Sequence, residues 1–229
     1  MNDYMDLSPF ILSFKLATTT TILLFVLVLP LAWYLSTTKS KFKPILESIA
    51  AMPIVLPPSV LGFYLLVFFS SDSIIGSFLQ HYFNIKLLFT FQGLVVASMI
   101  YSLPFMLQPL QSGLESVDKH MVEASYLAGK GRLSTLFRVT LPNMKPALMS
   151  ALVITFAHTV GEFGVVLMVG GSIPDKTRVA SVAIYEMVES LDYHNAHIYS
   201  AVMLLISFIV LLAVYIFNRR YGHTVGLYK

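Results

Sequence analysis

The sequence predicts an all-α membrane protein, a bundle of about five transmembrane helices. Hydrophobic residues make up 56% of the 229 residues and charged residues only 12%, and the mean hydropathy is +0.76. So few charges cannot cover the surface of a water-soluble domain of this size. The apolar residues also come in long blocks without polar backs, which indicates that lipid surrounds most of the chain.

Five apolar stretches are long enough to cross a bilayer, whose hydrocarbon core of about 30 Å needs about 20 helical residues. They are residues 10–35, 45–69, 88–110, 146–168 and 197–217. We treat residues 1–229 as one membrane domain, because no repeat, low-complexity tract or soluble domain interrupts this pattern. The acidic start MNDYMDLSPF lacks the positive region of a cleaved signal peptide, so the first stretch is expected to stay as a membrane helix.

The basic residues predict the orientation, because short loops rich in Lys and Arg remain cytoplasmic. Eleven of the 15 basic residues follow the first, third and fifth stretches: Lys39, Lys41, Lys43, Lys119, Lys130, Arg132, Arg138, Lys145, Arg219, Arg220 and Lys229. The opposite side is net acidic. We therefore expect the N-terminus outside and the C-terminus in the cytoplasm. Basic residues split among three loops argue against a nucleic-acid surface.

The segment 111–145, between the third and fourth stretches, is large enough to hold cytoplasmic structure. Asp118 is a good N-cap, and Val117 and Val122 are spaced to form a hydrophobic staple. A short helix is expected to stop near Gly129, since glycine adopts the left-handed conformation without penalty. A second short amphipathic piece, residues 133–139, leads to Leu141 and Pro142, where proline suits the first turn of the next membrane helix.

This segment resembles the cytoplasmic signature of ABC importer permeases. That signature is Glu-Ala-Ala, three residues, Gly, nine residues, Ile, one residue and Leu-Pro. The matching residues here are Glu123, Ala124, Ser125, Gly129, Val139, Leu141 and Pro142, with Ser for the third position and Val for Ile. The resemblance implies the type I importer permease fold, in which this segment is a coupling helix docked on a separate ATPase subunit. The alternative is an ordinary surface hairpin between two spans.

Two further motifs resemble the molybdate-type permeases. One is the run Met52 to Gly62, and the other is Gly161-Glu162-Phe163-Gly164 followed by Ser172-Ile173-Pro174. Tungstate and sulfate or thiosulfate permeases remain alternatives. The resemblance implies a homodimer in the cytoplasmic (inner) membrane, with two cytoplasmic ATPase subunits and an extracytoplasmic molybdate-binding protein. The chain has no Gly-x-x-x-x-Gly-Lys-Ser/Thr loop, so ATP hydrolysis is expected in a partner and no cofactor is predicted here.

Proline breaks the second stretch. Pro53, Pro57 and Pro58 cannot continue a regular helix, and broken membrane helices commonly line cavities. A half-helix restarting near Pro58 and Ser59 would direct free N–H groups at an oxyanion. The alternative is a kink packed against neighbouring helices.

Glu162 is the charged side chain deep within a predicted span, and such residues face a protein interior or a watery path. A carboxylate repels anions, so Glu162 is not expected to bind substrate. It is either protonated or part of a gate, with His158, four residues earlier, as a partner. A packed polar pair is the alternative. We predict that Pro57, Pro58, Ser59, His158, Gly161, Glu162 and Phe163 form the translocation path or its gate.

Two rival functions use other residues. A proton-coupled secondary transporter would employ Glu162 and His158 as a relay. A membrane metalloprotease would need His194 and His197 as ligands, but no Glu-containing zinc motif surrounds them and the chain has no cysteine, so no metal site is predicted.

Overall fold

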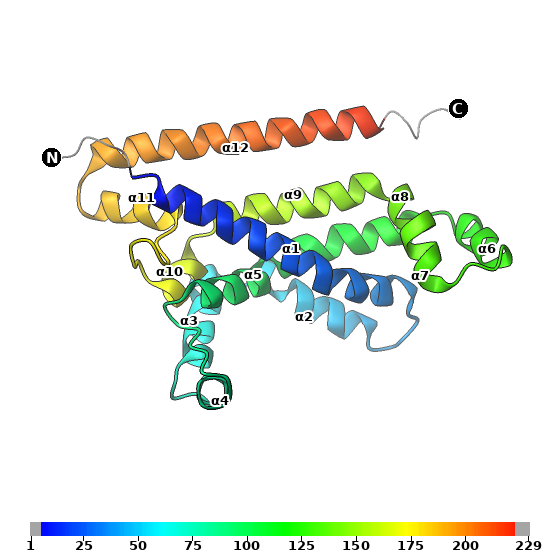
Figure 1. The fold of residues 1–229 in the computed structure, drawn as a ribbon, viewed down its shortest axis with the longest axis horizontal. Coiled ribbons are helices and arrows are strands. Elements are labelled where there is room, and N and C mark those ends of the chain that lie inside the picture. Colours follow the sequence, from blue (N-terminus) through cyan, green and yellow to red (C-terminus); the bar gives the residue numbers. More distant parts are fainter. Residues whose placement is uncertain (1–5, 223–229) are drawn as a thin grey trace.

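A computed structural model describes residues 6–222, and helices make up most of this range (Figure 1). No strand occurs among these residues, so the predicted fold class is confirmed. Asp3 and Lys229, which contribute to the charge pattern, lie outside the described residues. The elements are α1 (Ser8–Thr37), α2 (Lys43–Val55), α3 (Pro58–Phe69), α4 (Ile74–Phe83), α5 (Phe91–Ser116), α6 (Lys119–Leu127), α7 (Arg132–Thr135), the π-helical turn η1 (Leu136–Thr140), α8 (Leu141–Asn143), α9 (Lys145–Gly161), α10 (Gly164–Gly170), α11 (Ala180–Glu189) and α12 (Tyr193–Gly222).

Three helices are long and apolar enough to cross a membrane on their own: α1, α5 and the Tyr193–Leu212 part of α12. Two helix pairs pass the same test together but are bent at a short break. The pair α2 and α3 is bent by 110°, and Arg132–Asn143 is bent by 81° relative to α9. By length and composition the described residues thus hold three to five spans, which agrees with the prediction of about five.

The second predicted span, 45–69, consists of two helices. The break lies at Leu56 and Pro57, as the prolines predict, and Pro58 occupies the first turn of α3. Pro53, however, lies inside α2 without ending it. The prediction that all three prolines break the helix is therefore wrong for Pro53, whose ring is buried within a helix that continues to Val55.

The fourth predicted span, 146–168, is also interrupted, which the sequence analysis did not foresee. Helix α9 ends at Gly161, Glu162 is extended with φ −66° and ψ 133°, and α10 begins at Gly164. Gly164 places the start of α10 beside the start of α3. A Cβ atom there would lie 2.8 Å from Cβ of Pro58, so the start of α10 fits closely against the start of α3 only because Gly164 has no side chain. The two helix breaks are therefore neighbours.

The ends of two other predicted segments also differ. Helix α5 runs to Ser116, so the connecting segment predicted to begin at residue 111 begins at Val117. Its last turns continue because Leu110 and Leu114 are buried in the core. Helix α12 begins at Tyr193, four residues before the predicted start of the last span, and α4 and α11 are short helices without a predicted counterpart.

The core is the junction of α1, α5 and α9. Leu24, Val28, Ala32 and Leu35 of α1 pack on Met106, Leu107 and Leu110 of α5 and on Ala151 of α9. Near the end of α5, Gly113 lies so close to α9 that an added Cβ would be 2.5 Å from Cβ of Ala147. Such small residues allow close helix approach where hydrophobicity alone gives no driving force.

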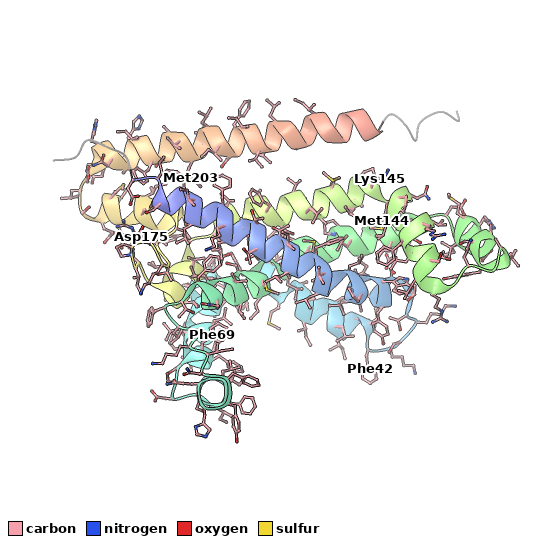
Figure 2. The ribbon with its side chains drawn as sticks, viewed as in Figure 1. Phe42, Phe69, Met144, Lys145, Asp175 and Met203 are labelled. Atoms are coloured by element: carbon pink, nitrogen blue, oxygen red, sulfur yellow. The ribbon has the colours of Figure 1, made fainter. Side chains whose placement is uncertain are left out.

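The bundle has two distinct ends (Figure 1). The α1–α2 connection, α6 to α8 and the last turns of α12 lie at one end, and α10, α11 and the first turns of α1 and α12 lie at the other. Figure 2 places Phe42 and Lys145 at the first end and Asp175 at the second. The described basic residues used for the orientation thus belong to segments at one end of the bundle, while α3 and α4 project from its side.

Candidate functional site

The signature segment forms a capped helix at one end of the bundle. Asp118 caps α6, because its carboxylate accepts a 2.9 Å hydrogen bond from the backbone N–H of His120. At the other end, Gly129 has φ +74°, and the Lys130 N–H bonds the Ser125 carbonyl at 3.1 Å. The predicted cap and the predicted left-handed glycine are both confirmed.

Helix α6 is exposed along its length and has no buried residue. The Glu123 side chain is 67% exposed, and Leu127 is 91% exposed although it is apolar. The Ser125 hydroxyl lies 2.9 Å from the Thr135 hydroxyl, which joins α6 to α7. A cleft of about 650 Å³ separates α6 from the ends of α1, α2 and α5. The segment therefore presents a preformed surface away from the core.

The second half of the signature lies in the π-helical turn η1 and the short helix α8. Val139 lies in η1, and its carbonyl accepts a 2.6 Å hydrogen bond from the Asn143 side chain. Leu141 and Pro142 begin α8, which ends at Asn143. The prediction that Pro142 starts the next membrane helix is therefore wrong. Pro146 has that place, in the first turn of α9, and the chain bends between the two helices.

Helix α5 leads directly into this surface. It ends at Ser116 and α6 begins at Lys119, so only Val117 and Asp118 connect them. Near its end, Glu115 accepts a 3.1 Å hydrogen bond from Lys43 of α2, and Gln111 donates to Glu47 at 2.6 Å and to Glu115 at 3.1 Å. These contacts tie α2 to α5 close to the α6 surface.

The second group of predicted residues gathers where α9 ends. Glu162 is only 4% exposed, and neither carboxyl oxygen has a hydrogen-bond partner among the described residues. Its backbone carbonyl accepts a 2.6 Å bond from the Ser181 hydroxyl of α11. The ring of Phe163 packs against Tyr185 at a centroid distance of 4.8 Å. The break is thus held from the α11 side.

His158 does not pair with Glu162. Its Nδ1 lies 2.9 Å from the hydroxyl of Ser102 on α5, and Ser102 lies 3.0 Å from the hydroxyl of Thr159. Thr159 in turn donates to the Thr155 carbonyl at 2.9 Å. The His158 ring stacks on Phe105 with centroids 4.0 Å apart, and the Tyr101 ring lies 4.8 Å away.

Pro57, Pro58 and Ser59 are exposed at the start of α3. Pro58 and Ser59 lie against Gly164 at the start of α10, so the structure brings these two predicted residues next to the Glu162–Phe163 break. Gly161 is exposed and has open space around it.

The sequence analysis missed the contribution of α5 to this site: Ser98, Tyr101, Ser102 and Phe105. Ser98 and Ser102 are fully buried. Their spacing of four within an apolar helix places both on one face, a signal that was available. No sequence pattern, however, connects residue 102 with residue 158.

The alternative metal site lacks ligands. Within residues 6–222, no three His, Cys, Asp or Glu side chains lie close enough together to hold a metal ion. His194 and His197 therefore have no third ligand in this part of the chain.

Solved structures share this fold. The inward-facing MetNI methionine ABC transporter matches with a TM-score of 0.70 and 16% identity, covering 91% of this chain and 92% of that one. The bacterial alginate ABC transporter, in complex with a periplasmic protein that holds an alginate pentasaccharide, matches with a TM-score of 0.72 and 19% identity, covering 93% and 79%. The chain therefore shares its fold with chains of these ABC transporters.

Sequence comparison gives the family. The model of the binding-protein-dependent transport system inner membrane component matches residues 27–223. The molybdenum transport system permease protein ModB of Azotobacter vinelandii is 46% identical over 214 residues, 93% of this chain and 95% of that protein. The sulfate transport system permease protein CysT of Salmonella typhimurium is 32% identical, covering 85% and 70%. The chain belongs to the binding-protein-dependent transport system inner membrane component family, and it is a multi-pass inner-membrane permease subunit.

Proposed function

We propose that this chain is the permease subunit of an ABC importer that moves molybdate across the cytoplasmic membrane, powered by a separate ATPase subunit. The observation that carries this proposal is the 46% identity to a molybdenum permease over nearly the whole of both chains. Sulfate permeases are less similar, at 32% identity for the Salmonella typhimurium protein. Tungstate, another tetrahedral dianion, is the other alternative substrate.

The exposed α6 surface is proposed as the ATPase-coupling surface, with Glu123, Ala124, Ser125, Gly129, Val139, Leu141 and Pro142 as its residues. A helix without buried residues, capped at both ends and carrying the exposed apolar side chain of Leu127, suits docking into a groove of a partner. Its position among basic loops supports a cytoplasmic location. The same charge pattern supports a single domain with its N-terminus outside and its C-terminus inside.

The two adjacent helix breaks are proposed to border the translocation path. Irregular backbone at membrane depth is tolerated where it is packed in protein or lines a cavity, and Pro57, Pro58, Ser59 and Gly161 are exposed beside the breaks. In a homodimer with two ATPase subunits and an extracytoplasmic binding protein, these surfaces of the two copies would face each other. Glu162 is buried behind them, which suits a role in holding the break and not in contacting the anion.

Reconstitution in vesicles tests this proposal. The permease is combined with its ATPase partner and a molybdate-binding protein, and molybdate uptake is measured with and without ATP. We expect uptake that requires all three proteins and ATP, with sulfate as a weak competitor. Uptake by the permease alone under a pH gradient would instead support the proton-coupled transporter.

A further inference from the structure

His158 lies on a face of α9 that the rest of the chain leaves partly uncovered. Ile154, one turn earlier on the same face, is 45% exposed. Gly161, one turn later, has no atom within 4 Å of the position of an added Cβ. The His158 ring is half-buried between them, with its Nδ1 edge bound to Ser102. The other ring nitrogen, Nε2, has no hydrogen-bond partner among the described residues, which leaves it for a ligand.

The contacts of Ser102 determine which nitrogen carries the proton. Thr159 has one hydroxyl proton, and its contact with the Thr155 carbonyl uses it, because a carbonyl only accepts. The contact between Ser102 and Thr159 then requires Ser102 to donate. The Ser102 proton is thereby used as well, so His158 Nδ1–H must donate to Ser102. Only this arrangement of protons allows all three contacts to be hydrogen bonds.

This order of protons limits what Nε2 can do. In the neutral ring Nδ1 holds the proton, so Nε2 has only a lone pair and cannot donate to an anion. Only the imidazolium form offers an N–H at this position. The Phe105 ring, stacked at 4.0 Å, presents its face to the imidazole, so an imidazolium at this position has a cation–π contact.

We propose that His158 contacts the transported oxyanion through a protonated Nε2, taking up one proton when the anion arrives. The inference rests on the proposed function as an oxyanion permease. The proton comes from the water around the entering anion and returns to water when the anion leaves, and no covalent bond forms or breaks. Ser102 and Thr159 are positioning residues that fix the ring and its tautomer.

Few other titratable groups surround this ring. The helices packed against α9 carry Lys15 and Tyr34 on α1, Tyr101 and Glu115 on α5, and Tyr193, His194, His197, Tyr199, Tyr215, Arg219, Arg220 and Tyr221 on α12. Of these, Tyr101 has a ring contact with His158. Lys15 lies over the Phe91 ring and Glu115 pairs with Lys43. Glu162 follows His158 at the end of α9, and its carboxyl group makes no hydrogen bond to the ring.

Nitrogen-15 NMR of the histidine-labelled complex tests the proton order directly, with His158→Asn to assign the signal. We expect the Nδ1–H tautomer without ligand and an imidazolium signal when molybdate is added. In Thr159→Val the Ser102 proton is released to bond Nδ1, so the ring should change to the Nε2–H tautomer. If the Thr159 hydroxyl only stabilised the fold, its loss would leave the tautomer of His158 unchanged. A resting Nε2–H tautomer in the unmodified protein would overturn the proposal.

Two substitutions of His158 test the separate roles of its two ring nitrogens in transport. Asparagine places its amide near Nδ1 and keeps the Ser102 contact, whereas glutamine places a permanently neutral donor near Nε2. We expect His158→Asn to slow uptake about tenfold to hundredfold, as for loss of a hydrogen bond to a charged group. His158→Gln should slow uptake less than His158→Asn does, and its uptake should no longer depend on pH. Equal uptake by both variants and the unmodified complex contradicts the proposal, whereas absence of uptake by the unmodified complex contradicts the proposed function.

Discussion

The α6–α8 surface is built from residues close together in the sequence, whereas the packing around His158 joins residues far apart in it. In α6 the cap, the terminal glycine and the signature residues all lie within residues 118–142, and each contact joins close neighbours. At the junction, Ser102 meets a histidine 56 residues away. The first region is exposed and shaped by local backbone preferences, whereas the second is buried and shaped by packing. Substitutions should therefore harm the fold in the second region and the coupling in the first.

The largest expected effect comes from filling the close contact between α5 and α9. Gly113→Leu places a side chain against Ala147 and Met144, where even a Cβ atom has no room. Overpacking of this kind costs about 1–3 kcal/mol or more, so we expect a lower unfolding temperature and little extractable protein. Ser112→Leu adds bulk on the exposed side of the same turn and serves as the control. Equal thermal stability of both variants would show that α5 and α9 can separate without loss of the fold.

The next effect concerns transport without loss of the fold. Gly129→Val meets no neighbouring atom but must adopt φ +74°, which costs a β-branched residue about 1–2 kcal/mol or distorts the turn. We expect normal membrane insertion and a several-fold loss of ATP-driven uptake. Gly131→Val, at φ −71° and equally free of contacts, should leave uptake unchanged. If both variants transport normally, the turn does not matter for coupling.

A smaller effect should follow loss of the α6 cap. Asp118→Ala removes the bond to the His120 N–H and should destabilise this helix by about 1 kcal/mol. Hydrogen exchange of the α6 amides should become faster while exchange in α5 stays the same. Asp118→Asn retains a capping oxygen and should resemble the unmodified protein. Faster exchange in α5 as well would mean that the two helices unfold together.

The smallest expected effect lies at the opposite end of the bundle. Bonds from the Ser8 N–H and hydroxyl, with the nearby Arg178 guanidinium, lower the pKa of the Asp6 carboxyl. A lowered folded-state pKa adds stability that is complete above the ordinary aspartate value of about 3.9 and is lost as pH falls through the folded value. Asp6→Asn should therefore reduce the change in unfolding temperature between neutral and strongly acidic pH. An unchanged pH profile would show that Asp6 does not contribute to the loss of stability in acid.

The same contrast explains which features could be predicted from sequence. Asp118, Gly129 and the break at Pro57 follow from local chemistry, and the structure contains all three. The break at Glu162 was not foreseen, because no proline marks it and the contact of Gly164 with Pro58 beside it joins residues far apart in the sequence. Ser102 was missed for a related reason. A buried serine in an apolar helix gives no indication of its partner until the helices are assembled.

The two-residue connection between α5 and α6 has a mechanical consequence. Val117 and Asp118 are too few to act as a flexible tether, since Asp118 is already fixed as the cap of α6. A displacement of α6 should therefore move α5 as well. The Lys43–Glu115 and Glu47–Gln111 contacts should carry this movement to α2. Because α5 also carries Ser102 and Phe105, a movement of its α6 end would shift the residues that the His158 ring contacts.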